Sequence, residues 1–399
     1  MYLNQKQFLM RSEALKELFG RWNPEIATES IAVSEAVGRV LSDAVSSVNT
    51  LPVCRSSKLD GIAVSFEALM QASGGQFPWT GTIAHVSADT GDDFDDAFDT
   101  VIAVERIVRH SDGSLTITSK EPIKQGQNIR PRGDTLKEGQ QLLKKDTLLQ
   151  PVHLAFLSTA GVSTVKVYKK PVVSFIPTGN ELIPIGVSPK RGQNIESNSL
   201  MVRTMLAQWG AKAHCCPIVK DDNVLMEETL LNACSKADIV LINGGSSMGS
   251  EDYASRLLQK HAEWFQHGIR CIPGIPIALA IIDKKPVINL PGPTLASYYA
   301  MDWCVKAMVF HMLKQDMPLR RTVRAVLKQK VQKPSHLEMY VRLRVKCING
   351  RYTAEVLSPQ KGLAQLLADC NALFIAPIGK ETFEAGEMVR AELLSGFDI

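Results

Sequence analysis

The spacing of apolar positions divides the chain into stretches of different period. Residues 4–19 carry apolar side chains at helical spacing, which predicts an N-terminal helix. A short apolar strand at Ser30–Val33 and a small helix around Ser34–Val40 are expected next. From about Val45 to Gly139, short alternating segments are separated by turn residues, a pattern typical of an all-β insertion. A helix over Pro151–Thr159, with proline in its first turn, is predicted to close this first lobe.

The stretch from Pro171 to His311 has a different pattern of apolar positions, because continuous apolar runs alternate with segments whose apolar residues recur at helical spacing. Such runs are typical of strands that are buried on both faces of a parallel sheet. The alternation implies right-handed crossovers and a doubly wound parallel sheet, in which ligands bind beyond the carboxyl ends of the strands. The predicted elements are, in order, strand Val172–Pro177, helix Ser199–Trp209 capped by Asn198 or Ser197, strand Ala213–Val219, a helix from Asn223 capped by Asp222, strand Ala237–Asn243, helix Asp252–Trp264, strands Ile277–Ile282 and Val287–Leu290, and helix Ala296–Leu313.

Short strands return after residue 319 and predict a small separate β domain. With 399 residues, the chain is also too long for one ordinary core. We therefore predict a multi-domain α/β and β protein. The predicted domains are residues 1–45 together with 140–170, residues 46–139, residues 171–318 and residues 319–399.

The composition is that of an ordinary globular protein. The formal net charge is only +4, so bulk electrostatics give no argument for nucleic-acid binding. No run of about 18 apolar residues occurs and the N-terminus lacks the features of a signal peptide, so we expect no membrane span and a cytoplasmic location. The eight cysteines form no CxxC motif and mostly lie in apolar runs. Buried thiols in a reducing cytosol are therefore favoured over a redox pair or soft-metal site at Cys215 and Cys216.

The segment GGSSMGSEDY (244–253) connects a predicted strand to a predicted helix. Its two glycines allow a tight turn, after which backbone amides, Ser246 and Ser247 can face an anion at the helix N-terminus. No GK[ST] follows, so the segment is not a Walker sequence. The pattern leaves open a phosphate site and a plain turn between strand and helix.

Three other polar segments carry candidate chemistry. In PTGNELIPIG, Glu181 follows a strand, where its carboxylate can bind a metal, accept a proton or simply be solvated. In SSKLDGIAV, Asp60 is either a turn residue or a carboxylate presented to a cleft. In NIRPRGDTLK, Arg130 and Arg132 can clamp a phosphate or a carboxylate, or belong to a solvated basic loop. Asp221, beside the predicted cap Asp222, fits a helix N-terminus at least as well as a metal site.

These motifs, in this order and at this spacing, resemble molybdopterin molybdenumtransferases, the bacterial relatives of the E domain of gephyrin. LPVCRSSKLDGIAV is similar to the family's LPPFDNSAMDGYAV, and GQNIRPRGDTLKEGQQLL to its NVRxxGEDxxxG segment. TGNEL, GQNIESN, IVKDD, ADIVLINGGSSMGSEDY and VINLPGPTLAS match TGDEL, GQIxDxN, IxxDD, DxxxxSGGxSxGxxD and LPGNPxS in turn. The resemblance covers essentially the whole chain.

The resemblance implies an elongated dimer. Each subunit would have an elongated N-terminal linker and dimerisation domain interrupted by the β-rich insertion, a central molybdopterin-binding α/β domain and a small C-terminal β barrel. The family's active site lies between the central domain of one subunit and the insertion of the other. The implied reaction takes adenylylated molybdopterin and molybdate with Mg²⁺, and releases AMP as molybdenum enters the dithiolene. Implied partners are a second copy of the chain, a molybdopterin adenylyltransferase and molybdoenzyme maturation proteins.

By resemblance, five residues occupy the family's catalytic positions, of which Glu181 and Asp252 would hold Mg²⁺. Arg132 would hold molybdate or a phosphate. The candidate catalytic residues are Asp60, Thr90, Glu181, Asp221 and Asp252. The candidate cofactor-binding residues are Arg132, Thr178, Gly179, Gly244, Gly245, Ser246, Ser247, Gly249, Pro291 and Gly292.

The chain departs from the family pattern around the anionic ligands. The family's KPGKP segment reads CIPGIP (271–276), with only Arg270 beside it to compensate, and acidic residues crowd the segment after Thr90. Loss of two lysines would weaken substrate binding by about a few kcal/mol. Three hypotheses therefore stand: an active transferase, a catalytically weak paralogue that carries molybdopterin, and an interaction scaffold.

Overall fold

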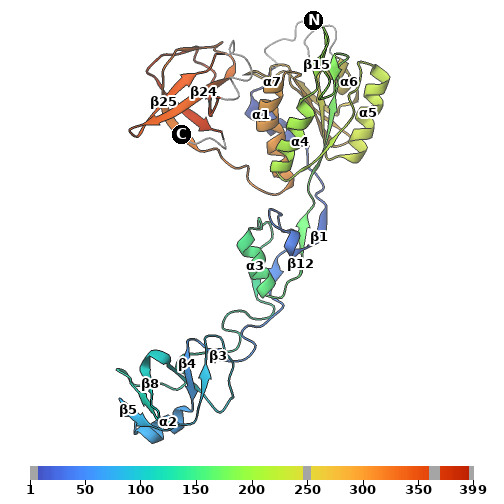
Figure 1. Cartoon of the computed structure of the whole chain (residues 1–399). Coiled ribbons are helices and arrows are strands. Elements are labelled where there is room, and N and C mark those ends of the chain that lie inside the picture. The colour runs from blue at the N-terminus through green and yellow to red at the C-terminus, as the bar shows by residue number, and fades with distance from the viewer. Residues whose placement is uncertain (1–7, 246–252, 359–368, 395–399) are drawn as a thin grey trace. The chain divides into compact units, whose positions relative to one another are not determined.

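The computed structural model describes residues 8–245, 253–358 and 369–394. They belong to two compact units, Thr28–Tyr168 (the small unit) and Met1–Ala27 with Lys169–Ile399 (the large unit). Figure 1 shows helices on both faces of a sheet in the large unit, and the strand-rich small unit. Each unit is described by itself below. The division of the chain into four domains at the bounds given above stays a prediction.

A six-stranded sheet organises the large unit, in the order β16-β13-β17-β21-β20-β18. Its strands are β16 (Lys212–Cys215), β13 (Val172–Pro177), β17 (Ile239–Asn243), β21 (Lys285–Leu290), β20 (Ala278–Ile282) and β18 (Trp264–His267). The first four pair in parallel, whereas β20 is antiparallel to both of its neighbours. The predicted α/β fold class is confirmed, but the expectation of a wholly parallel sheet is wrong at this edge.

The turn between β20 and β21 gives the physical reason. Only Asp283 and Lys284 connect these strands, and both have positive φ angles, 48° and 62°. Two residues at positive φ form a hairpin turn, whereas a parallel crossover needs about a dozen residues or more. The pair lacks the glycine that usually occupies the second position of such a turn. The sequence pattern therefore did not predict a hairpin here. The helix predicted at Asp252–Trp264 also ends earlier than expected, at His261, and Trp264 is the first residue of β18.

Helices cover both faces of this sheet, as expected for a doubly wound domain. Alternate residues of β13 point to opposite faces: Phe175 packs with α1, α4 and the C-terminal helices, whereas Ile176 packs with α5 and α6. The π-helical segment η4 interrupts what was predicted as one helix after β21. The helices are α1 (Arg11–Arg21), α4 (Asn198–Gln208), α5 (Asn223–Lys236), α6 (Tyr253–His261), α7 (Thr294–Ala300), η4 (Met301–Val305) and α8 (Lys306–Met312).

The C-terminal part of the large unit is a closed small β barrel, which confirms the expected β domain. Its strands follow one another in the order β24-β25-β22-β28-β26, and a further pairing of β26 with β24 closes the circle. The short strand β19 (Cys271–Ile272), from the α/β domain, adds to β24 in parallel. The barrel strands are β22 (Thr322–Leu327), β24 (Glu338–Ile348), β25 (Arg351–Val356), β26 (Ala372–Ala376) and β28 (Met388–Leu393), with the short pair β23 (Val331–Gln332) and β27 (Thr382–Phe383).

The small unit is rich in short strands, as predicted. Two three-stranded sheets, β6-β4-β7 and β5-β9-β8, enclose a core that includes Ile62, Ile102 and Ile117. The helix α2 (Phe66–Ser73), capped by Ser65, corrects the expectation of an insertion without helices. The strands of the small unit are β1 (Thr28–Ala32), β2 (Val45–Ser46), β3 (Ser56–Ser57), β4 (Gly61–Val64), β5 (Trp79–Gly81), β6 (His85–Ala88), β7 (Thr100–Ala103), β8 (Ile107–Arg109), β9 (Leu115–Ile117), β10 (Ile129–Arg130), β11 (Gln141–Leu143) and β12 (Thr164–Tyr168).

A second helix of the small unit, α3 (Pro151–Thr159), has the bounds that the sequence predicts. It packs through Leu157 on a core that includes Leu41 and Val167. In the described parts of both units, no helix combines the length and the apolar character needed to cross a membrane.

Candidate functional site

Three loops leave the same edge of the large unit's sheet. The register pairs Pro177 with Asn243 and Asn243 with Leu290, so β13, β17 and β21 end side by side. The loops that follow line a cavity of about 750 Å³. A second cavity of about 440 Å³ shares Thr178 and Glu181 with it. This is the position at which doubly wound folds bind their ligands.

Glycines let these loops approach one another closely. Gly244 has a φ of +117°, and a Cβ atom there would lie 2.4 Å from the carbonyl oxygen of Thr178. At Gly179, a Cβ atom would lie 2.5 Å from a carboxylate oxygen of Glu181. Gly292 has no such constraint, since a Cβ atom would meet nothing within 4 Å. The turn after β17 therefore requires glycine for steric reasons, whereas the turn after β21 does not.

A buried amide network holds two of the loops together. The side-chain amide of Asn243 donates to the carbonyl oxygen of Pro291 at 2.7 Å and to the hydroxyl of Ser297 at 2.9 Å. The amide of Asn198 donates to Oδ1 of Asn243 at 2.8 Å and to the carbonyl oxygen of Gly292 at 2.9 Å. Sequence reasoning assigned Asn198 only to a helix cap and missed Asn243 and Ser297. The signal for Asn243 was an amide that ends a continuous apolar strand.

Two carboxylates line the larger cavity. The hydroxyl of Thr178 donates to Asp221 at 3.3 Å, and the backbone N–H of Asn180 donates to the same carboxylate at 3.2 Å. Glu181 is exposed and lines both cavities. Asp222 caps α5 by accepting from the N–H of Leu225, as predicted. Asp221 is thus anchored to the loop after β13, with its carboxylate at the cavity.

The predicted site residues of the large unit fall into two groups. Eight of them line the larger cavity, whereas four lie outside the described residues. Those lining the cavity are Thr178, Gly179, Glu181, Asp221, Gly244, Gly245, Pro291 and Gly292. Those outside the described residues are Ser246, Ser247, Gly249 and Asp252.

The remaining predicted residues belong to the small unit, where the structure brings two of them together. The backbone N–H and the hydroxyl of Thr90 both donate to Oδ1 of Asp60, at 2.7 and 2.8 Å. These hydrogen bonds lower the pKa of the exposed Asp60 carboxyl below its ordinary value. Arg132 is exposed and follows β10. Asp60 therefore stays ionised to a lower pH than a free aspartate.

The larger cavity has an unusual charge balance. Its described lining includes Glu181 and Asp221 but no lysine, arginine or histidine. Pro273, Gly274 and Pro276 form one wall, in the segment where the family pattern has lysines. Arg270 lines neither of the two cavities. Within the described residues, no three His, Cys, Asp or Glu side chains gather as a metal cluster.

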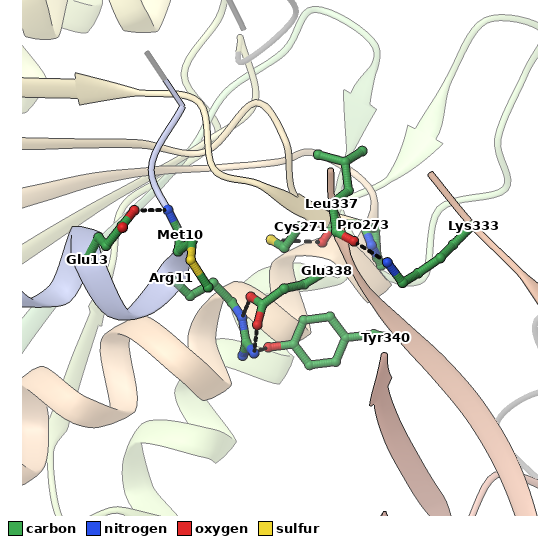
Figure 2. A network of polar contacts seen from close by, with 9 residues as sticks. All are labelled: Met10, Arg11, Glu13, Cys271, Pro273, Lys333, Leu337, Glu338 and Tyr340. Atoms are coloured by element: carbon green, nitrogen blue, oxygen red, sulfur yellow. Dashed lines mark hydrogen bonds and ion pairs between the residues drawn. The ribbon is translucent and has the colours of Figure 1, made fainter. Parts of the chain in front are cut away.

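That wall is supported by the barrel and by the N-terminal segment. Cys271 and Ile272, just before the wall, pair with Glu338 and Met339 of β24. Figure 2 shows Arg11 reaching both Glu338 and Tyr340, and Cys271 directed at the carbonyl of Pro273.

The ion pair from Arg11 Nε to Glu338 measures 2.7 Å, with both side chains less than a fifth exposed. Burial raises the pKa of the Cys271 thiol to about 12, so it is no ready thiolate ligand.

Comparisons with known proteins agree with this arrangement along the whole chain. Residues 9–161 match the family "MoeA N-terminal region (domain I and II)", residues 174–311 the "Probable molybdopterin binding domain", and residues 324–394 the "MoeA C-terminal region (domain IV)". A molybdopterin molybdenumtransferase of Haemophilus influenzae is 28% identical over 336 residues, which cover 81% of this chain and 79% of that protein. One from Staphylococcus aureus is 25% identical over 378 residues and 90% of each chain.

Solved structures share the fold. The molybdopterin biosynthesis MoeA protein of Pyrococcus horikoshii superposes with a TM-score of 0.79 at 24% identity, over 98% of this chain and all of that one. A MoeA-like protein needs a sheet of the molybdopterin-binding type, β-rich flanking domains and a closed C-terminal barrel, and all of these are present. The chain belongs to the MoeA family, whose curated members are named molybdopterin molybdenumtransferases.

Proposed function

We propose that the protein inserts molybdenum from molybdate into adenylylated molybdopterin and releases AMP. The cavity of about 750 Å³ beyond β13, β17 and β21 carries this proposal, because it joins a glycine turn to two carboxylates. Backbone amides at such a turn suit a phosphate group. The relatives' names and the family's molybdopterin-binding domain support the same chemistry.

In this proposal, the chain's own groups bind and orient the substrate. Gly244 and Gly245 let the backbone approach a phosphate closely, since a side chain at Gly244 would collide with Thr178. Asp221 is held by Thr178 and Asn180, so its carboxylate is oriented before substrate binds. Glu181 stands between the two cavities and can accept a proton or hold a cation.

The donor set fits Mg²⁺, which prefers carboxylate oxygens and retains several waters. Glu181 is exposed at the cavity and, with Asp252 as the second ligand, would hold the ion. When bound, Mg²⁺ would neutralise charge at the phosphorus atom of the adenylate under attack. The described lining has no cationic side chain, so a polyanionic substrate needs such a charge.

We extend the proposal to a homodimer, in which Asp60 and Thr90 of one subunit act on the substrate of the other. An exposed apolar face around α3 supports a second copy as the occupant, with Val152 and Phe156 70% and 41% exposed. Val37, Val48 and Leu148, in the same unit, are exposed apolar side chains as well. We assign the reaction to the cytoplasm, next to an adenylyltransferase that supplies substrate and maturation proteins that take up product.

AMP release tests the proposal. Purified protein is mixed with adenylylated molybdopterin, molybdate and Mg²⁺, and AMP is followed over time. Glu181→Gln and Asp252→Asn should each slow release by about two orders of magnitude, the order seen when one group that stabilises transition-state charge is removed. Glu228→Gln, on the exposed side of α5 and away from both cavities, is the matched control and should leave the rate unchanged.

The outcomes separate the three hypotheses. Tight binding of the adenylate without AMP release would favour the hypothesis of a molybdopterin carrier over that of an active transferase. If the protein neither binds the adenylate nor releases AMP, the hypothesis of an interaction scaffold remains. A normal rate in Asp252→Asn would remove that residue from the metal site while leaving the activity in place.

A further inference from the structure

Residues 268–277, which carry the wall of the larger cavity, are hydrogen-bonded to two distant parts of the chain. The backbone N–H of Arg270 donates to the carbonyl oxygen of Leu9 at 2.9 Å. The carbonyl oxygen of Arg270 accepts from the N–H of Glu338 at 2.9 Å, where β19 pairs with β24. The N-terminal segment and the barrel therefore both hold the backbone from which the wall projects.

Three side chains tie these two parts of the chain to each other (Figure 2). The Nε atom of Arg11, two residues after Leu9, lies 2.7 Å from the carboxylate of Glu338. A second guanidinium nitrogen of Arg11 donates to the hydroxyl of Tyr340 at 2.5 Å. Because the ion pair is mostly buried, solvent ions screen it little. We call Arg11, Glu338 and Tyr340 the clamp.

The clamp also contacts a second part of the cavity lining. The ring of Tyr340 stacks on the ring of Tyr299 in α7, with the ring centroids 4.3 Å apart and the planes at 11°. Tyr299 lies three residues after Ala296, which lines the larger cavity from the same helix. Residues at this spacing are neighbours on a helix surface. One barrel side chain is therefore linked both to the segment that carries the wall and to α7.

The carboxylates of the site are anchored independently of the clamp. Asp221 accepts hydrogen bonds from Thr178 and Asn180, in the loop after β13. Arg11, Glu338 and Tyr340 line neither of the two cavities. Loosening the clamp should therefore displace the wall and leave the carboxylates in place.

We propose that Arg11, Glu338 and Tyr340 are positioning residues, which set the affinity of the larger cavity for its substrate by fixing the wall. Pro273, Gly274 and Pro276 have no charged side chain, so the wall attracts a ligand through van der Waals contact. A gap of about 0.5–1 Å already loses about a quarter to a half of such a contact. The inference rests on the proposed function, since it takes adenylylated molybdopterin as the substrate.

The split between KM and kcat tests this role, measured on the full chain as AMP release from adenylylated molybdopterin with molybdate and Mg²⁺. The double variant Arg11→Met with Glu338→Leu leaves no charge buried alone, so the fold is retained while the ion pair is lost. We expect its KM to rise about tenfold with kcat unchanged, because misplacement by about 1 Å can cost up to about 10²-fold. Loss of folded protein would instead lower the apparent kcat and leave KM unchanged.

A second variant and a matched control complete the series. Tyr340→Leu removes both the contact with Arg11 and the stack on Tyr299, and should raise KM in the same direction. Arg344→Gln breaks another ion pair of β24, with Asp369, outside both cavities, and should keep the wild-type KM. Calorimetric titration of the adenylate without molybdate and Mg²⁺ should give a Kd that follows KM across the series.

Hydrogen exchange reports on the wall without any substrate. The N–H groups of Ile269 and Ile277 donate to the carbonyl oxygens of Ile275 and Gly274 at 3.0 and 3.2 Å. In mass spectrometry, peptides from residues 268–277 should exchange faster in the double variant and in Tyr340→Leu than in the wild type. The same peptides of Arg344→Gln should exchange at the wild-type rate.

An unchanged KM in the double variant and in Tyr340→Leu would overturn the positioning role, as would unchanged hydrogen exchange in residues 268–277. A lowered kcat with a normal KM would also overturn it, since the clamp would then act only on stability. Normal turnover with a KM independent of the clamp removes the positioning role and keeps the activity. No turnover in the wild type, with a Kd for the adenylate that depends on the clamp, removes the activity and keeps the positioning role.

Discussion

At the scale of single residues, Gly244 sets how closely the loop after β17 can pass the loop after β13. Replacement by alanine forces a positive φ on a residue with a side chain and drives its Cβ atom against the Thr178 carbonyl. We expect Gly244→Ala to lower the free energy of unfolding by about 2 kcal/mol or more. Gly292→Ala, in the same cavity but with open space at its Cβ position, should change it by less than about 0.5 kcal/mol.

Chemical denaturation of the two variants measures this difference. Equal stability of Gly244→Ala and Gly292→Ala would mean that the backbone at Gly244 can shift, and that the close approach to Thr178 is not a constraint. A selective loss in Gly244→Ala would show that the turn is fixed by sterics, independently of any ligand.

A second residue-scale prediction concerns the pKa of Asp60, which its hydrogen bonds from Thr90 lower. Thr90→Val removes the hydroxyl donor and keeps the shape, so the pKa of Asp60 should rise toward the ordinary value of about 3.9. A carboxyl with a depressed pKa stabilises the fold above its unfolded pKa and loses that contribution as pH falls through its folded pKa. In Thr90→Val, the loss of folding stability on acidification should therefore begin at a higher pH than in the wild type.

A carboxyl-detected NMR titration reads this pKa directly. Asp112 serves as the internal control, because its own lowered pKa depends on Ser114 and should not move. An unchanged pKa of Asp60 in Thr90→Val would leave only the backbone N–H as the cause of its shift.

At the scale of elements, the pair of Arg11 and Glu338 ties α1 to β24 beside the cavity wall. Arg11→Met would leave a mostly buried carboxylate without its partner, and such a loss costs about 3 kcal/mol of stability. The exposed pair of Lys380 and Glu387 is the control, since Lys380→Met should cost less than about 1 kcal/mol. Urea unfolding compares the two.

Adding Glu338→Leu to Arg11→Met should restore much of the lost stability, because no charge then remains buried alone. A double variant no more stable than Arg11→Met would locate the effect in packing around Tyr340 rather than in the charge.

Sequence pattern predicted elements well where a local rule applied. Pro151 fixed the start of α3, and the apolar run Val172–Pro177 is β13 residue for residue. It failed where the structure depends on contacts distant in sequence. The hairpin at Asp283 and Lys284 lacks the glycine that usually follows Asp in such a turn, and no local signal separates β18 from the end of a helix.

In the candidate site too, sequence predicted the residues that a local rule identifies and missed those that depend on contacts distant in sequence. Glycines and carboxylates next to strand ends were found, because strand ends of a parallel sheet meet at one edge. The amide network of Asn198, Asn243 and Ser297 was not, since its members come from three separate elements.

At the scale of the whole molecule, the apolar face around α3 predicts self-association. Val152→Asp and Phe156→Asp place a charge in an interface that would otherwise bury apolar surface from both copies. We expect each to convert dimer to monomer at micromolar concentration in analytical ultracentrifugation. Val108→Asp, also in the small unit and 54% exposed but on β8, should leave the dimer intact.

Two results would contradict this prediction. A wild-type protein that sediments as a monomer would remove the homodimer, and with it the assignment of Asp60 to the partner's substrate. A dimer that survives Val152→Asp and Phe156→Asp would move the interface away from α3.

The pairing of β19 with β24 also bears on how the protein is made. Arg11 and Glu338, which form an ion pair at this pairing, stand 327 residues apart in the sequence, and the backbone N–H of Arg270 donates to the carbonyl oxygen of Leu9. The segment that forms the cavity wall thus has one neighbour synthesised near the start of translation and another near its end. Contacts of such long range form late. The central domain can emerge and collapse before the barrel has been synthesised, but the wall segment gains its pairing with β24 only afterwards.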